Sequence, residues 1–278
     1  MSLKQYVKRM IILQSIYARI NKLLWIYLFA GSMIALLYGC TASSNLNYQK
    51  RASSVDSERT IQFSGYTWVV RDNPELAGPG PNIFNSSKRS VWVDRRGRLH
   101  LMIRLQRGKW TCAEIVSQKT FGYGTFRFTL APNVFNIDPQ AVLGLFLYDK
   151  NASNTAYREI DIEVSKWGFP DGKNIQYALH SRNSGPTVNR FKIKPSKKSS
   201  VHEFKWSHGE LNFHSYHAAD ANSSDISQNL QDWTYDKSGD VPKPGNSKAY
   251  INLWLYEGKP AYYGKDVEVV IENFEYLQ

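Results

Sequence analysis

Apolar and polar residues alternate in short runs from Ile61 to the end of the chain, and turns rich in glycine, proline and asparagine separate these runs. Alternation with a period of two is the pattern of β-strands that bury one face. No segment after Ile61 has a convincing helical period. The predicted strands cover residues 66–70, 91–93, 99–105, 110–116, 125–130, 142–148, 157–164, 175–180, 201–206, 211–216, 248–256 and 267–276.

A dozen or so short strands within ~220 residues fit an all-β domain, an antiparallel two-sheet β-sandwich or jelly roll. Residues 142–148 are almost wholly apolar, so we expect this strand to be buried on both faces. Residues 78–82 read Gly-Pro-Gly-Pro-Asn, a sequence that predicts a rigid turn.

The predicted strand at 157–164 has the most regular alternation in the chain. Its apolar side carries Ile160, Ile162 and Val164, which are residues that favour strands. Its other side carries Glu159, Asp161 and Glu163, with no lysine or arginine between them on that face. Acids at alternate positions of a strand are ~6.6 Å apart and repel one another. The repulsion within such a row destabilises the fold, so its presence indicates a functional role.

Two carboxyl groups that face one sugar can cleave a glycosidic bond, because one protonates the leaving oxygen while the other attacks or activates water. A third acid between them can shift their pKa values apart. The row Glu159, Asp161 and Glu163 is therefore a candidate catalytic site. The alternative is a solvated strand face that happens to be acidic.

The 278 residues suffice for one large β domain and an appendage. Aromatic residues make up 14% of the chain, which suits a packed sandwich or a platform for sugar rings. The formal net charge is +11, and residues 1–39 hold five basic residues and no acid, so 11 − 5 leaves +6 for the rest. This modest, scattered excess favours an acidic polysaccharide or an anionic envelope as a partner, and nucleic acid is not expected.

The N-terminal segment, residues 1–40, has the features of an export signal. Residues 1–22 are basic and partly apolar, residues 23–37 form an apolar stretch with small residues inside it, and Gly39 and Cys40 follow. The sequence Leu-Tyr-Gly-Cys that ends at Cys40 resembles a bacterial lipobox, which implies that Cys40 is lipidated and becomes the new N-terminus. The alternative is an uncleaved anchor that spans the membrane once.

Both interpretations of the N-terminal segment place the following domain outside the cytoplasm, as a membrane-anchored lipoprotein of the bacterial cell envelope or as a secreted protein. Residues 41–59 are polar and predict a flexible tether. The domain itself is expected to occupy residues 60–278 and to be a monomer.

No metal or cofactor motif is present. The cysteines Cys40 and Cys112 lack metal-ligand spacing, and Cys112 is expected to be a small buried hydrophobe. The spacing of His208, His214 and His217 fits no zinc motif, so we expect surface or turn histidines. A structural calcium is compatible with the sequence, although nothing in the sequence indicates one.

The acidic strand and its surroundings resemble glycoside hydrolase family 16. Residues 159–163, Glu-Ile-Asp-Ile-Glu, match the E-[IVL]-D-x-E strand of that family in its regular form. Residues 121–126, 200–206, 251–255 and 267–276 resemble strands that flank it. Residues 78–82 and 158–168 look like a little-described bacterial branch of the family.

The resemblance implies a curved, concanavalin A-like jelly roll with the acidic strand on the floor of a concave cleft. It also implies that Glu159 is the nucleophile, Asp161 the tuning acid and Glu163 the general acid/base. Hydrolysis would then retain the anomeric configuration through a covalent glycosyl-enzyme intermediate.

Sugar rings dock on aromatic faces and on polar groups that contact hydroxyls. The aromatic candidates near the acidic strand are Trp167, Tyr177 and Trp254; the polar candidates are Asn82, Glu114, Gln176 and His180. For each residue, the alternative is a core aromatic or a hydrogen-bonded turn residue. If strand 175–180 pairs with the acidic strand, alternation places Gln176 and His180 together on one face.

The sequence thus predicts an extracytoplasmic, retaining endo-glycoside hydrolase or transglycosylase that acts on a β-linked polysaccharide. A non-catalytic carbohydrate-binding or envelope-structural lipoprotein on the same fold is the alternative. The intact acid row favours the enzyme, because a binding protein has no use for three clustered carboxylates. The absence of the tryptophan that the family usually places before the acidic strand, where residues 144–148 read Gly-Leu-Phe-Leu-Tyr, favours the binding protein.

Overall fold

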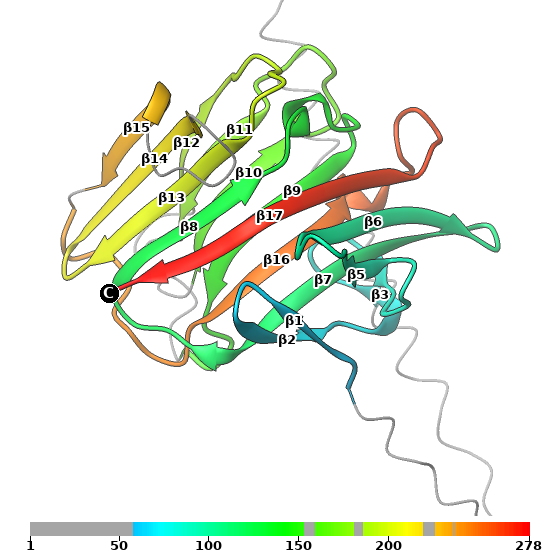
Figure 1. The fold of residues 1–278 in the computed structure, drawn as a ribbon, viewed down its shortest axis with the longest axis horizontal. Helices are drawn as coiled ribbons and strands as arrows, with labels where there is room; N and C mark the ends of the chain where they lie inside the picture. The colour runs from blue at the N-terminus through cyan, green and yellow to red at the C-terminus, as the bar shows by residue number, and fades with distance from the viewer. Residues whose placement is uncertain (1–57, 153–158, 181–185, 219–225, 236) are drawn as a thin grey trace, which may run out of the picture. The chain divides into compact units, whose positions relative to one another are not determined.

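The structure is a computed structural model that describes residues 58–152, 159–180, 186–218, 226–235 and 237–278 (Figure 1). The predictions for the signal at 1–40, for lipidation of Cys40 and for most of the tether lie outside these residues. Within the described part of the chain, no helix is both long and apolar enough to cross a membrane.

The first sheet places the acidic strand among antiparallel neighbours. Its order is β1 (Thr60–Phe63), β2 (Tyr66–Val70), β7 (Lys109–Thr120), β16 (Lys248–Leu255), β9 (Ala141–Tyr148), β10 (Glu159–Ser165), β11 (Ile175–Leu179) and β12 (Thr187–Phe191).

The second sheet is also antiparallel. Its order is β5 (Val91–Val93), β6 (Leu99–Gln106), β17 (Val267–Leu277), β8 (Gly124–Leu130), β13 (Ser200–Ser207), β14 (Glu210–Ala218) and β15 (Ile226–Tyr235).

The hairpin of β6 and β7 joins the two sheets, because β7 is long enough to pair with β6 at one end and with β2 and β16 at the other. Two short strands, β3 (Asn73–Ala77) and β4 (Asn82–Phe84), lie beside β7, and β4 pairs with β7 in parallel. Two single-turn helices, η1 (Val134–Asn136) and η3 (Tyr256–Gly258), complete the described elements.

Aromatic side chains fill the space between the sheets. Tyr177 on β11 stacks on Phe213 of β14, with ring centroids 4.7 Å apart. Trp68 on β2 meets Phe274 of β17 edge to face at 5.3 Å. These contacts join the two layers, so the predicted all-β, two-sheet sandwich is confirmed, and Cys112 is buried as expected.

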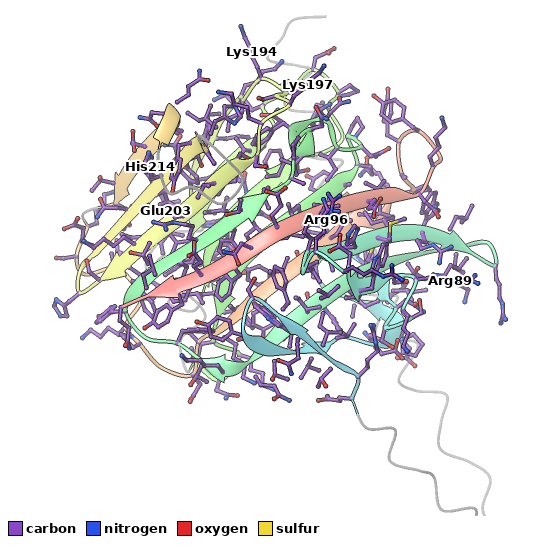
Figure 2. The ribbon with its side chains drawn as sticks, in the orientation of Figure 1. Arg89, Arg96, Lys194, Lys197, Glu203 and His214 are labelled. Carbon is purple, nitrogen blue, oxygen red and sulfur yellow. The ribbon has the colours of Figure 1, made fainter. Side chains whose placement is uncertain are left out.

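The outer face of the second sheet is polar. Arg127 on β8 donates to Glu203 on β13 at 2.6 Å, and His214 on β14 lies beside Glu203 (Figure 2). His208 is exposed in a turn, as predicted. The prediction for His217 was wrong: this residue is 4% exposed, because the chain at Ser199 covers it.

His202 lies on the inward face of β13, where burial lowers the pKa of its imidazole to about 3. The unfolded chain binds a proton at this imidazole below a pH of about 6.5, whereas the folded domain excludes it. The contribution of His202 to stability is therefore complete above that pH and decreases as the pH falls toward the folded pKa. We expect a decrease of up to about 1.4 kcal/mol per pH unit in the free energy of unfolding.

Urea denaturation at several pH values measures this slope. His202→Gln should flatten the slope, and His208→Gln, a change at an exposed turn, should leave it unchanged. An equal slope in His202→Gln would assign the acid sensitivity to other groups.

Candidate active site

The acid row lies on the face of β10 that points away from the core. Ile160, Ile162 and Val164 are buried between the sheets, so alternation turns the three carboxyls to the opposite side. The register with β9 places Glu159 opposite Tyr148, Asp161 opposite Phe146 and Glu163 opposite Gly144.

A groove of about 430 Å³ lies over this face of the first sheet. Its walls come from β9, β10, β16 and β7, and from the turn after β3. The lining residues are Arg71, Gly78, Pro79, Glu114, Gly144, Phe146, Tyr148, Glu159, Asp161, Glu163, Tyr250, Asn252 and Trp254. Among them Arg71 is the single basic residue, and the labelled bases Arg89, Arg96, Lys194 and Lys197 lie elsewhere on the domain (Figure 2).

Asp161 occupies the centre of the acid row and is 6% exposed. Burial raises the pKa of its carboxyl well above the usual range, and the charges of Glu159 and Glu163 raise it further. The row therefore holds a shared proton more readily than three isolated carboxyls would. This is the behaviour that a tuning acid between two catalytic carboxyls requires.

Glu163 is held by a chain of contacts from β11 and β12. Gln176 Nε2 donates to Glu163 Oε2, and Arg190 donates to Gln176 Oε1 at 2.8 Å through Nε. The guanidinium of Arg190 in turn lies 3.7 Å from the centroid of the Trp167 ring. Burial raises the pKa of Glu163, while the Gln176 hydrogen bond and the Arg190 charge lower it. The net effect is a pKa above the usual range for a glutamate, and the Gln176 hydrogen bond reduces the size of this rise.

Gln176→Met should raise the pKa of Glu163. The substitution removes an N–H that stabilises the ionised carboxylate and keeps the volume of the side chain similar. NMR titration of the Glu163 side-chain carboxyl carbon measures the change, and Gln228→Met on the exposed edge strand β15 is the matched control. A midpoint at lower pH in Gln176→Met would contradict the assigned direction.

Glu114 on β7 anchors a second polar group of the groove, separated from Glu163 on β10 by the strands β16 and β9. Its carboxylate accepts from Arg71 Nη1 at 3.1 Å and from Asn252 Nδ2 at 3.0 Å, and burial raises its pKa. Gly144 lies against this group: a side chain there would collide with Asn252 Oδ1. A buried carboxylate and amide beside a groove supply acceptors and donors for hydroxyl groups.

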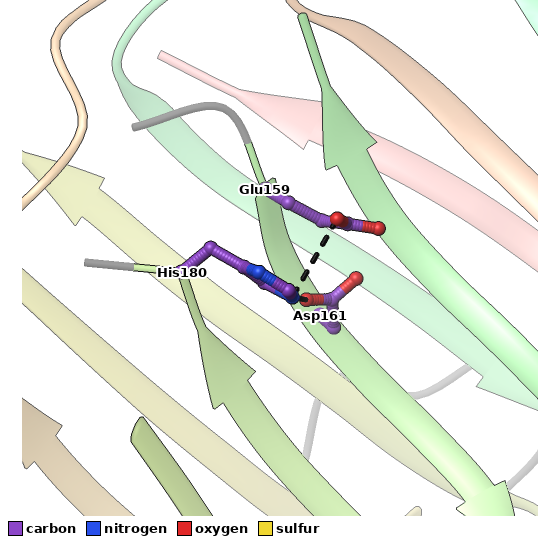
Figure 3. A group of neighbouring side chains, drawn as sticks. All are labelled: Glu159, Asp161 and His180. Atoms are coloured by element: carbon purple, nitrogen blue, oxygen red, sulfur yellow. Dashed lines mark ion pairs between the residues drawn. The ribbon is translucent and has the colours of Figure 1, made fainter. Parts of the chain in front are cut away.

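His180 follows β11 and lies next to the acid row, as Figure 3 shows. Its Nε2 is 3.5 Å from Glu159 Oε2 and 3.8 Å from Asp161 Oδ2. Strand β11 pairs with β10, so the predicted common face of Gln176 and His180 is the face of the acids.

The structure brings together most of the candidate residues. Glu159, Asp161, Glu163, Glu114 and Trp254 line the groove. Gln176 and His180 contact the acid row. Trp167 follows β10 in the chain. It is 7% exposed and Arg190 covers one face of its ring, so it offers no free ring to a sugar.

Two candidates lie elsewhere. Tyr177 is fully buried on the core side of β11, and its hydroxyl donates to Ser215 at 2.6 Å, so alternation turns it away from the groove. Asn82 is 4% exposed, and its amide donates to the carbonyls of Pro79 and Leu255. Asn82 therefore holds the turn at 78–82 against the end of β16, and neither residue can contact a sugar from its position.

Five lining residues with polar or aromatic side chains were not among the candidates from the sequence: Arg71, Phe146, Tyr148, Tyr250 and Asn252. Two of them lie on β9, whose predicted burial on both faces is confirmed, because seven of its eight residues are buried. One face of β9 packs in the core through Leu143, Leu145 and Leu147, whereas Phe146 and Tyr148 on the other face line the groove. β9 and β10 are consecutive antiparallel strands. Their pairing places Phe146 opposite Asp161 and Tyr148 opposite Glu159, so both aromatic residues lie beside the acids.

No protein-family model matches the chain, and no curated protein matches it significantly. Among solved structures it is similar to a Bacillus licheniformis β-glucanase, with a TM-score of 0.57 and 18% identity over 80% of this chain and 96% of that one. A Bacteroides ovatus glycoside hydrolase family 16 protein in complex with its G4G4G3G product gives a TM-score of 0.56 at 15% identity, over 76% and 94% of the chains.

A further solved structure gives a contrasting case. A Mycobacterium tuberculosis protein described as a pseudo β-1,3-glucanase aligns with a TM-score of 0.55 and 13% identity, over 76% of this chain and 90% of that one. The domain therefore has the jelly-roll fold of bacterial glycoside hydrolase family 16 β-glucanases, as the resemblance implied. That fold includes proteins with and without hydrolytic function.

Proposed function

We propose that this domain is a retaining endo-glycoside hydrolase, or transglycosylase, that acts on a β-linked glucan. The observation that supports the proposal is that three carboxyls in a row line one groove together with aromatic side chains. The β-glucanases of the same fold support the choice of a glucan as substrate.

In the proposed reaction Glu159 attacks the anomeric carbon while Glu163 donates its proton to the leaving glycosidic oxygen. A covalent glycosyl-enzyme forms and one sugar fragment departs. Glu163, now ionised, takes a proton from water or from a sugar hydroxyl, whose oxygen attacks the anomeric carbon and releases Glu159. The raised pKa of Glu163 suits the first step, because the proton must be present before the bond breaks.

Sugar rings would stack against Tyr148, Tyr250 and Trp254. Phe146 is 9% exposed and its ring stacks on Tyr250, so it would support this surface from beneath. Glu114 and Asn252 would exchange hydrogen bonds with hydroxyl groups further along the groove. A groove that admits a polymer in the middle of its chain would give internal cleavage.

Incubation of the purified domain with β-1,3-glucan, β-1,4-glucan, mixed-linkage β-glucan and galactan tests the proposal. Appearance of reducing ends, with a β-anomer as the first product in NMR spectra, would support retaining hydrolysis. Longer oligosaccharides without a net gain of reducing ends would indicate transglycosylation. An α-anomer as first product would refute the two-step mechanism.

The alternative is a carbohydrate-binding protein on the same fold. A solved structure with this fold, described as a pseudo β-1,3-glucanase, supports considering this alternative. Calorimetric binding of an oligosaccharide without product, equal in the wild type and in Glu159→Gln, would support this alternative and reject the enzyme.

We also propose that the protein is exported and anchored to the bacterial envelope through a lipid on Cys40. The basic, apolar and Gly-Cys sequence of residues 1–40 supports this proposal. Metabolic labelling with a fatty-acid analogue should mark the wild type and not Cys40→Ser, and Cys112→Ser should label normally. Equal labelling of Cys40→Ser would reject lipidation at this residue.

A further inference from the structure

Three side chains from two neighbouring strands meet at one end of the acid row. Glu159 and Asp161 come from β10, and His180 follows β11 (Figure 3). Each offers one ligand atom, and these atoms lie within 4.8 Å of one another. An imidazole and two carboxylates are the ligand types that bind divalent transition metals.

The separations suit a small cation. Two ligands bound tetrahedrally at the usual zinc distances are about 3.4 Å apart. The distances from His180 Nε2 to Glu159 Oε2 and to Asp161 Oδ2 are 3.5 Å and 3.8 Å. Small rotations of the side chains would therefore bring all three atoms to one metal ion, without movement of β10 or β11.

A second observation concerns Asp161. Its Oδ2 is buried and has no hydrogen-bond partner within the described residues, and this is the oxygen that points toward His180. A buried carboxyl oxygen without a hydrogen-bond partner destabilises a fold unless a proton or a cation lies next to it. A divalent cation held jointly with His180 and Glu159 would supply that partner.

We propose that Glu159, Asp161 and His180 form a binding site for a divalent transition metal of the zinc class. The imidazole ligand disfavours magnesium and calcium, which prefer sets of oxygen ligands. The side chains of His180 and Glu159 are 38% and 27% exposed, so the cation reaches the site from the groove and keeps room for water in its remaining coordination position.

The metal would occupy Glu159 and so prevent its attack on a glycosidic bond. On this view zinc is a reversible inhibitor of the proposed hydrolase, and this consequence rests on the proposed function. The metal site itself does not depend on that function. The inference revises the expectation from the sequence that no metal binds, because His180 lies on another strand and forms no local motif with the acids.

Calorimetry with zinc chloride tests the site in the purified domain, using the wild type, His180→Gln, Glu159→Gln and, as a matched control, His208→Gln. We expect one zinc ion with micromolar or tighter affinity in the wild type and in His208→Gln. Each of the other two variants should bind at least about tenfold more weakly, since each loses a ligand. Zinc should raise the Tm of the wild type and of His208→Gln, with no such rise in His180→Gln. Magnesium chloride should bind none of these proteins measurably.

Equal affinity in the wild type and His180→Gln, or no binding in the wild type, would overturn the proposal. Zinc binding that needs His180 in a domain that cleaves no glucan would support the metal site and reject the hydrolase. Cleavage of glucan without zinc binding would support the hydrolase and reject the metal site. The two proposals can therefore fail separately.

Discussion

Glu159→Gln should abolish hydrolysis of β-glucan, with a loss in kcat on the order of 10⁴-fold or more. The amide has nearly the shape of the carboxylate, yet it cannot form the glycosyl ester on which the proposed mechanism depends. Glu159 borders the open groove, so the substitution should leave the Tm within a few degrees of the wild-type value. Release of reducing ends and thermal unfolding measure the two quantities.

Glu210→Gln is the matched control for this experiment. Glu210 is exposed at the start of β14 in the second sheet and contacts none of the groove residues, so both activity and Tm should be unchanged. Turnover of Glu159→Gln close to that of the wild type would remove Glu159 from the mechanism and the acid row from its proposed role.

Glu163→Gln should reduce kcat/KM on polymeric glucan by about 10²–10⁴-fold. The glutamine cannot protonate the leaving sugar, and a sugar alkoxide is a poor leaving group. A dinitrophenyl β-glycoside needs no such proton, so its first step should be nearly as fast as in the wild type. The glycosyl-enzyme should then accumulate, because no base remains to activate water.

For Glu163→Gln we therefore expect a rapid burst of dinitrophenolate release followed by slow steady-state turnover. Added azide, an anion that attacks without help from a base, should speed the slow phase and yield a β-glycosyl azide. Equal losses on the polymer and on the activated substrate, with no burst and no azide effect, would contradict the role of Glu163 as acid/base. The contrast with Glu159→Gln, which should form no intermediate on either substrate, separates the two roles.

The sequence alone was sufficient for the central strand. Alternation divides the side chains of β10 into an apolar set and an acidic set, and the core of the sandwich can accept only the apolar one. The orientation of Glu159, Asp161 and Glu163 toward a common surface follows from that division. The same argument, applied to β11, placed Gln176 and His180 on the face of the acids once the two strands were paired.

The wrong prediction for Tyr177 shows that residue type alone does not identify a sugar-binding residue. A tyrosine near a sugar site is as suitable for a core as for a groove, and its position in the alternation of β11 decides between them. Because adjacent residues of a strand point to opposite faces, Tyr177 cannot share a face with Gln176. The sequence alone was therefore sufficient to exclude Tyr177 from the site. Trp167 is different, because only the position of Arg190 on another strand shows that its ring is covered.

The sequence by itself determined which strand holds the acids, which side of that strand is buried and that the domain is a sandwich, because these properties depend on local alternation. The tertiary structure alone decided that Asn252 and Arg71 meet Glu114, that Arg190 and Gln176 hold Glu163, and that His180 reaches Glu159. The contacts of Glu114 join strands that are distant in sequence, and those of Gln176 and His180 depend on the register between the consecutive strands β10 and β11. Their register depends on the packing of the whole sheet, for which local alternation contains no information.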